Sequence, residues 1–133
     1  IVLFLDEAHQ FLKKSVQDEY FAELELDAFD KISKECRKHG LYLCISTQMP
    51  RDIPDGTLSQ MGTFIVHRLI NEKDREKIQN ACSEANKQSL SYLPILGEGV
   101  ALLVSVNLPM PVLIKVKKPV REPDSKSPVL FSS

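Results

Sequence analysis

Residues 1–10 read Ile-Val-Leu-Phe-Leu-Asp-Glu-Ala-His-Gln, and this stretch decides the fold. A continuous apolar run of this kind predicts a strand that is buried on both faces of a parallel sheet. Asp6 and Glu7 would then lie at the carboxyl end of the strand, where open α/β sheets bind their ligands. Two acids there suit magnesium-nucleotide chemistry: Asp6 would hold a hydrated Mg²⁺, and Glu7 would orient and deprotonate an attacking water. From these residues alone, the alternative is that both acids cap a helix that follows a core strand.

A second buried strand is predicted at residues 41–46, which read Leu-Tyr-Leu-Cys-Ile-Ser. It runs into the polar residues Thr47 and Gln48. A glutamine at this strand end can accept a hydrogen bond from water and donate one to a phosphate oxygen, which an aspartate cannot do. Gln48 is therefore a candidate partner for the acid pair, and the alternative is a loop glutamine without a role.

The rest of the chain supplies helices and a terminal hairpin. Gly40 is predicted to end a helix over residues 17–39, and Asn71 to cap the start of a helix over 72–85. The other expected elements are a turn-rich connector at 52–61, a strand at 63–67, a short helix at 87–93 ended by Pro94, and two strands at 100–105 and 112–116. A helix between the first two strands indicates a parallel pair joined by a right-handed crossover, and the last two strands indicate an antiparallel hairpin.

Composition excludes several classes of protein. The chain has 133 residues, 43% of them hydrophobic and 26% charged, and a net charge of −1, so no global basic field attracts nucleic acid. Its three cysteines are far apart, which predicts neither a zinc module nor a disulfide framework and fits a reducing cytoplasm. Its apolar runs are too short to cross a bilayer, so no membrane partner is expected.

The chain is expected to be the carboxyl-terminal part of a longer protein. It opens in mid-strand, and none of its five glycines belongs to the phosphate-binding pattern G-x-x-x-x-G-K-[ST]. Residues 1–118 would form the carboxyl-terminal half of a motor domain, and residues 119–133, rich in proline and serine, a flexible tail. Alone, the fragment would be inactive and marginally stable, because a sheet without its phosphate-loop strand exposes an apolar edge.

Several segments together resemble the HerA/FtsK family of hexameric P-loop ATPases. They are VLFLDEAH at 2–9, CRKHGLYLCISTQMP at 36–50, LSQMGTFIVHRLIN at 58–71 with Asp74, GEGVAL at 97–102 and PVLIKV at 111–116. The resemblance implies an α/β fold of P-loop NTPase (RecA-like) type, with a partial parallel sheet, flanking helices and a C-terminal β-hairpin. It also implies an ATP-dependent DNA translocase or helicase that uses ATP and Mg²⁺, a homo-hexameric ring with DNA in its pore, and a partner nuclease or defence effector.

The same resemblance assigns roles to individual residues. Asp6 matches the acid that holds Mg²⁺ through water, and Glu7 the catalytic base. Gln48 matches the γ-phosphate sensor, so Asp6, Glu7 and Gln48 together form the implied nucleotide site. Arg37 matches an arginine that reaches the nucleotide of a neighbouring subunit, and Arg68 is a second candidate, as sensor or interface residue. The alternatives are dipole pairing at a helix end for Arg37 and a surface salt bridge for Arg68.

Two other functional classes stay open at this stage. One is a non-catalytic module that forms the ring and carries an effector. The other is a superfamily-two helicase fragment, because Asp-Glu-Ala-His at residues 6–9 also marks that group. The superfamily-two reading is the weaker one, because those proteins follow the acidic string with Ser-Ala-Thr, whereas this chain has Ser-Thr-Gln at 46–48.

Overall fold

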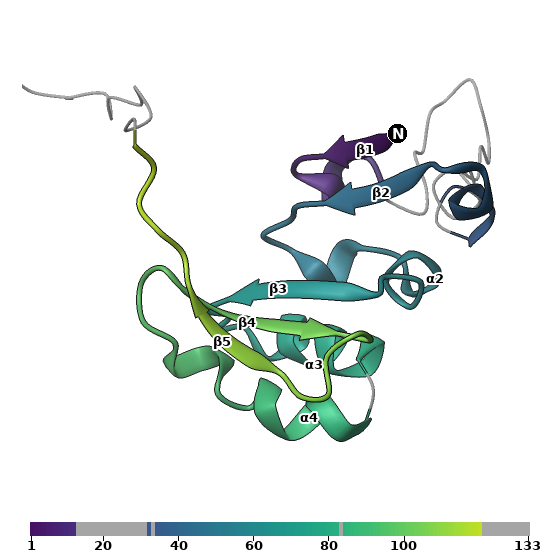
Figure 1. Cartoon of the computed structure of the whole chain (residues 1–133). Helices are drawn as coiled ribbons and strands as arrows, with labels where there is room; N and C mark the ends of the chain where they lie inside the picture. The colour runs from purple at the N-terminus through teal and green to yellow at the C-terminus, as the bar shows by residue number, and fades with distance from the viewer. Residues whose placement is uncertain (13–31, 33, 83, 121–133) are drawn as a thin grey trace, which may run out of the picture.

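The computed structural model describes residues 1–12, 32, 34–82 and 84–120 of the chain (Figure 1). The strands are β1 (Val2–Leu5), β2 (Tyr42–Ile45), β3 (Thr63–His67), β4 (Val100–Ser105) and β5 (Val112–Lys115). The α-helices are α2 (Asp55–Leu58), α3 (Glu72–Ala81) and α4 (Glu84–Leu90), and the 3₁₀-helices are η1 (Ala8–Gln10), η2 (Cys36–His39), η3 (Pro50–Asp52) and η4 (Leu93–Ile95). The α/β class expected from the sequence is confirmed.

β1 and β2 form a parallel two-stranded sheet, as expected, with Val2 opposite Tyr42 and Leu5 opposite Ile45. Gly40 follows η2 and has a φ of 73°, the left-handed conformation that a glycine adopts at low cost, and β2 begins two residues later at Tyr42. Most of the helix predicted over residues 17–39 lies outside the described residues, which include only its last part and η2.

Burial of β1 on both faces was expected and is not observed in this chain. Phe4 is 72% exposed, whereas its neighbour Leu5 packs against a buried cluster. The cluster consists of Ala8, Leu12, Ile53 and Leu58. The described residues therefore cover one face of the β1–β2 sheet, and the apolar side chains on the other face meet solvent.

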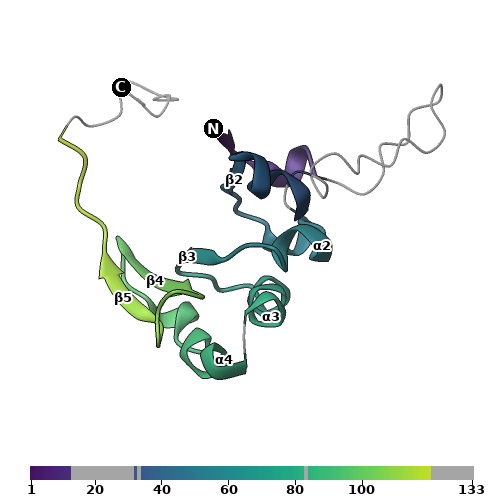
Figure 2. The ribbon, with the colours of Figure 1, turned by 45° about the vertical axis from the view of Figure 1, so that its right-hand side comes forward.

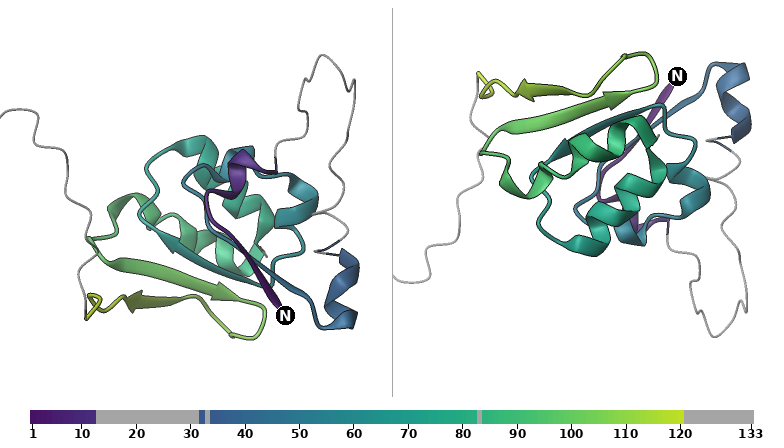
Figure 3. Two further views of the ribbon diagram at one scale, coloured as in Figure 1. Left: turned by 90° about the horizontal axis from the view of Figure 1, so that it is seen from above. Right: turned by 90° about the horizontal axis from the view of Figure 1, so that it is seen from below.

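The second sheet contains β3, β4 and β5 in that order, and both pairings are antiparallel. The predicted β4–β5 hairpin is confirmed. β3 pairs with β4 and not with the parallel strands, so the described chain holds two small sheets in place of one. In Figure 1, β3 nevertheless runs in the same direction as β1 and β2, below them. Seen from above and below, β5 forms the outer edge of the molecule (Figure 3).

Helices α3 and α4 lie side by side on one face of the second sheet (Figure 2). The predicted helix over 72–85 ends at Ala81, and Cys82 has the extended angles φ −92° and ψ 159°. This break lets Ile78 of α3 and Leu90 of α4 pack into one cluster with the sheet residues Leu102 and Val104. Leu93 and Leu96, which follow α4, complete the cluster. No helix among the described residues is long and apolar enough to span a bilayer.

Candidate functional site

The carboxyl ends of β1 and β2 continue side by side into two loops. The backbone N–H of Ser46 donates to the Leu5 carbonyl at 2.8 Å, and that of Ala8 donates to the Ser46 carbonyl at 2.9 Å. Asp6 and Glu7 belong to the first loop, and residues 46–51, here called the Gln48 loop, form the second. Strand pairing therefore brings the two predicted groups to one edge of the sheet.

Glu7 and Gln48 meet directly. The Gln48 Nε2 amide donates to Glu7 Oε1 over 2.6 Å, between residues that are 41 positions apart in the sequence. The Glu7 side chain is 36% exposed, so water reaches it. The acid and the amide, which were predicted from two separate strand ends, are thus in direct contact at a place that is open to solvent.

Glu7 also has an unusual backbone conformation. Its φ of 49° and ψ of 44° place it in the left-handed region, and it is the one non-glycine residue of the described chain with a positive φ. This conformation costs an L-residue roughly 1–2 kcal/mol, and residues held in it occur in tight turns and cluster at active sites. Asp6 Oδ1 accepts the backbone N–H of Glu7 at 3.1 Å. Asp6 and Glu7 therefore form a tight turn immediately after β1.

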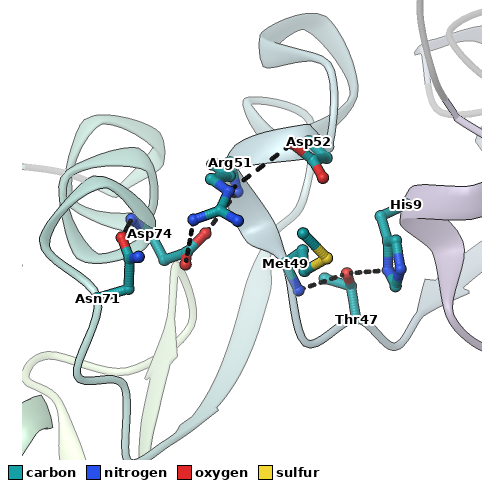
Figure 4. Close-up of polar contacts among 7 residues, drawn as sticks. All are labelled: His9, Thr47, Met49, Arg51, Asp52, Asn71 and Asp74. Atoms are coloured by element: carbon teal, nitrogen blue, oxygen red, sulfur yellow. Dashed lines mark hydrogen bonds and ion pairs between the residues drawn. The ribbon is translucent and has the colours of Figure 1, made fainter.

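His9 joins the two loops a second time (Figure 4). Its Nδ1 lies 3.0 Å from Thr47 Oγ1 and 3.4 Å from Glu7 Oε2. Thr47 Oγ1 also accepts the backbone N–H of Met49 at 3.0 Å. In the sequence His9 belongs to the acidic string and Thr47 to the polar end of the second strand, and no local pattern connects these two residues.

The far end of the Gln48 loop is attached to α3, as Figure 4 also shows. Asp74 is 4% exposed, and its Oδ1 accepts the backbone N–H of Arg51 at 3.0 Å while its Oδ2 lies 3.7 Å from Arg51 Nη1. Asn71 Oδ1 accepts the Asp74 N–H at 3.3 Å, which confirms Asn71 as the N-cap of α3. An acid in the first turn of a helix is ordinarily explained by the helix dipole, so this tertiary contact had no separate signal in the sequence.

The two candidate arginines lie away from Glu7. Arg37 belongs to η2, which precedes β2, whereas Glu7 and Gln48 follow their strands. A strand of four residues separates these positions by about 10 Å or more. Arg68 comes directly after β3 and is exposed. The structure thus places the backbone of Arg37 at the opposite end of β2 from the acid–amide pair, and Arg68 at the end of β3 in the other sheet.

The acid pair fits a magnesium ion better than a transition metal. No three His, Cys, Asp or Glu side chains gather within the described ranges, so a cage made of protein ligands is not present there. Mg²⁺ in nucleotide sites keeps several waters and takes only one or two carboxylates together with substrate phosphates. Asp6 offers such a carboxylate, with no described residue bonded to its second oxygen.

Comparison with known proteins finds a family model, described as helicase HerA-like C-terminal, that matches residues 1–129. A probable helicase of Methanocaldococcus jannaschii is 33% identical over 119 residues, which are 88% of this chain and 22% of that protein. The probable DNA double-strand break repair helicase HerA of the same organism is 31% identical, over 89% of this chain and 22% of its own length. The DNA double-strand break repair helicase HerA of Pyrococcus furiosus is 27% identical, over 87% and 20%. The chain thus spans about a fifth of the length of these relatives.

Among solved structures, the chain resembles the genome packaging NTPase B204 of Sulfolobus turreted icosahedral virus 2. The complex with AMPPCP superimposes with a TM-score of 0.70 at 21% identity, over 89% of this chain and 53% of that one. The complex with ATP-gammaS gives a TM-score of 0.67 at 20% identity, over 88% and 52%. At this identity the likeness establishes a shared fold.

Proposed function

We propose, from the premise that this chain belongs to the HerA-like helicase family, that it carries the hydrolytic half of an ATP-driven DNA translocase or helicase. The single observation behind the proposal is the 2.6 Å hydrogen bond between Gln48 Nε2 and Glu7 Oε1 across two parallel strand ends. A carboxylate beside an amide can take a proton from water while the amide donates to a phosphate oxygen. Gln48 would then release Glu7 when water and the γ-phosphate lie between them.

In this scheme Asp6 holds Mg²⁺ through water, Glu7 is the general base, and Gln48 senses the γ-phosphate. The metal neutralises charge on the phosphates when it is bound. Exposure of Glu7 supports its role, because an attacking water has to reach the carboxylate. ATP is the proposed nucleotide, and solved complexes of the packaging NTPase with ATP-gammaS and AMPPCP support this choice.

The phosphate-binding loop would come from another part of the protein, on a strand inserted between β2 and β3. Within the described chain, β2 pairs only with β1 and β3 pairs only with β4, so each has a free edge. Both strands run in the same direction in Figure 1, as a shared parallel partner requires. The matched part of this chain makes up only 22% of each of these relatives, which leaves ample sequence for such a strand.

Hydrolysis is proposed to take place between subunits of a homo-hexameric ring with DNA in its pore. Arg37 lies at the edge of the sheet opposite Glu7, which supports a role on the nucleotide of a neighbouring subunit. Arg68 is exposed after β3 and is the second candidate for this contact. The names of the relatives, which refer to DNA double-strand break repair, support DNA as the substrate. A nuclease or other effector as the partner is proposed from the family resemblance alone.

Glu7→Gln in the full-length protein tests the proposal. The amide cannot accept a proton from water, so the kcat of ATP hydrolysis should fall at least about 100-fold while nucleotide binding, measured by a fluorescent ATP analogue, stays within about twofold. Glu98→Gln is the matched control, because Glu98 is an exposed acid in the turn before β4 and should leave turnover unchanged.

Each alternative function predicts a different result. Retained turnover in the Glu7→Gln variant would contradict the assigned base. A wild-type ring that binds ATP without hydrolysing it would identify the non-catalytic scaffold, and a monomer with helicase activity would identify a superfamily-two protein. Mass measurement of the assembled protein separates the last two outcomes.

A further inference from the structure

The Gln48 loop contains a hydroxyl group whose contacts connect both halves of the proposed site. We propose that Thr47 is the positioning residue of this site: its hydroxyl holds His9 and the Gln48 loop so that Glu7 and Gln48 face each other. The inference rests on the proposed ATP hydrolysis. It gives a role to Thr47, which has none in the scheme of Asp6, Glu7 and Gln48.

Thr47 Oγ1 makes one bond on each side of the site. Toward its own loop it accepts the backbone N–H of Met49 at 3.0 Å, which fixes the turn on which Gln48 is the central residue. Across the loops it lies 3.0 Å from His9 Nδ1, a contact over 38 positions of sequence. Both the Thr47 and His9 side chains are partly buried, so water competes weakly for these bonds.

The neighbouring carboxylate indicates which group donates in the hydrogen bond between His9 Nδ1 and Thr47 Oγ1. Glu7 Oε2 lies 3.4 Å from His9 Nδ1, and an ionised carboxylate can only accept hydrogen bonds. A lone pair on Nδ1 would face this oxygen unfavourably, so Nδ1 carries the hydrogen. Thr47 Oγ1 then accepts from both His9 and Met49, and its two lone pairs are fully used.

The contacts of Thr47 Oγ1 therefore help to hold both Glu7 and Gln48 in place. The imidazole ring, fixed by Thr47, lies beside one oxygen of Glu7, and Gln48 bonds the other oxygen. Gln48 in turn stands between Thr47 and Met49, the two residues that the Thr47 hydroxyl ties together. Loss of the hydroxyl would free the ring and the turn at once, and misplacement of reacting groups by about 1 Å costs roughly 100-fold in rate.

A plain structural reading is that Thr47 caps a turn and His9 lies beside it by chance. The two readings differ in what they predict for catalysis. A capping hydroxyl affects stability, whereas a positioning hydroxyl affects kcat more than KM and acts together with His9.

The test uses the full-length protein and compares Thr47→Val, which removes the hydroxyl at nearly constant shape, with Thr47→Ser, which keeps it. We expect Thr47→Val to lower the kcat of ATP hydrolysis about 10- to 100-fold with KM for ATP within about threefold, and Thr47→Ser to restore kcat to within about threefold. Thr63→Val is the matched control, because it removes an exposed threonine hydroxyl bonded to Ser105 on the second sheet and should leave kcat unchanged.

His9 supplies the second arm of the test, which stays informative if Thr47→Val fails to fold. His9→Ala should lower kcat as Thr47→Val does, and His9→Asn, whose amide nitrogen can replace Nδ1, should recover most of the loss. The double variant Thr47→Val with His9→Ala should be no slower than the slower single variant, because both remove the same contact.

The outcomes separate this inference from the proposed function. Wild-type turnover together with an unchanged kcat in Thr47→Val and His9→Ala would overturn the positioning role and leave the ATPase proposal intact. Additive losses in the double variant would also overturn it. Absence of ATP hydrolysis in the assembled wild-type protein would overturn both proposals.

Discussion

The two sheets of this chain are stabilised in different ways. The β3–β4–β5 sheet has a buried cluster on one face, with Leu90 and Leu93 fully enclosed. The β1–β2 sheet carries the candidate site, yet Phe4 on its uncovered face is 72% exposed. Each sheet therefore has one face packed within the described residues and one face that meets solvent, as Ile65 of β3, 59% exposed, shows for the second sheet. The comparison teaches that the packing unit, which is the β3–β4–β5 sheet with its larger buried cluster, is separate from the chemical unit, which is the β1–β2 sheet with the candidate site.

The largest effect should come from breaking the packing unit. Leu93→Ala removes a side chain with 0% exposure from the cluster under the second sheet, which costs about 2–5 kcal/mol in free energy of unfolding. Denaturant unfolding of the full-length protein measures it. Ile95→Ala, at a position two residues away that is 76% exposed, is the matched control and should cost less than about 0.5 kcal/mol.

The reactivities of one cysteine thiol near each sheet provide a chemical comparison of the two regions. Burial raises the pKa of Cys82, beside the second sheet, from 9.0 to about 11, so its thiolate at pH 8 is about 100-fold scarcer than that of an ordinary thiol. Cys44 on β2 is exposed. In a Cys36→Ser background of this chain, a disulfide reagent should label Cys44 at least about 100-fold faster than Cys82. Equal rates would contradict the burial difference.

The same pKa shift predicts a dependence of stability on pH. Because the folded state raises the pKa of Cys82, folding favours the neutral thiol. This contribution is complete below the ordinary value of 9.0 and is lost as pH rises toward about 11. A Cys82→Ala variant should show a weaker loss of stability over that range in thermal unfolding scans.

Removal of the contact between Asp74 of α3 and the Gln48 loop should have an intermediate effect on stability. Asp74→Ala leaves the Arg51 backbone N–H without its 3.0 Å acceptor and frees one end of the Gln48 loop, so about 1–3 kcal/mol of stability should be lost. Asp74→Asn keeps an oxygen at that place and should lose less. If both variants unfold at the same denaturant concentration as wild type, α3 does not anchor the loop.

The smallest effect should come from the uncovered face. In the 133-residue chain, Phe4→Ala removes a side chain that already meets solvent and should change stability by less than about 1 kcal/mol. In the full-length protein, the same substitution should cost more if other segments cover β1. Equal costs in the two settings would mean that nothing packs on this face.

Local patterns predicted much of this molecule correctly. The strands β1 and β3, the N-cap at Asn71 and the left-handed Gly40 follow from periodicity and from the backbone preferences of single residues. The break after Ala81 was missed, because helix propensity continues through it and only packing under the second sheet decides it.

The sequence by itself determined which chemical groups follow each strand: the acid pair after β1 and the amide after β2. Only the tertiary structure decided that Glu7 bonds Gln48, that His9 bonds Thr47 and that Asp74 anchors Arg51. These contacts join residues 23 to 41 positions apart, and local propensities carry no information over such distances. Parallel pairing of β1 with β2 and packing of α3 against η3 bring them together.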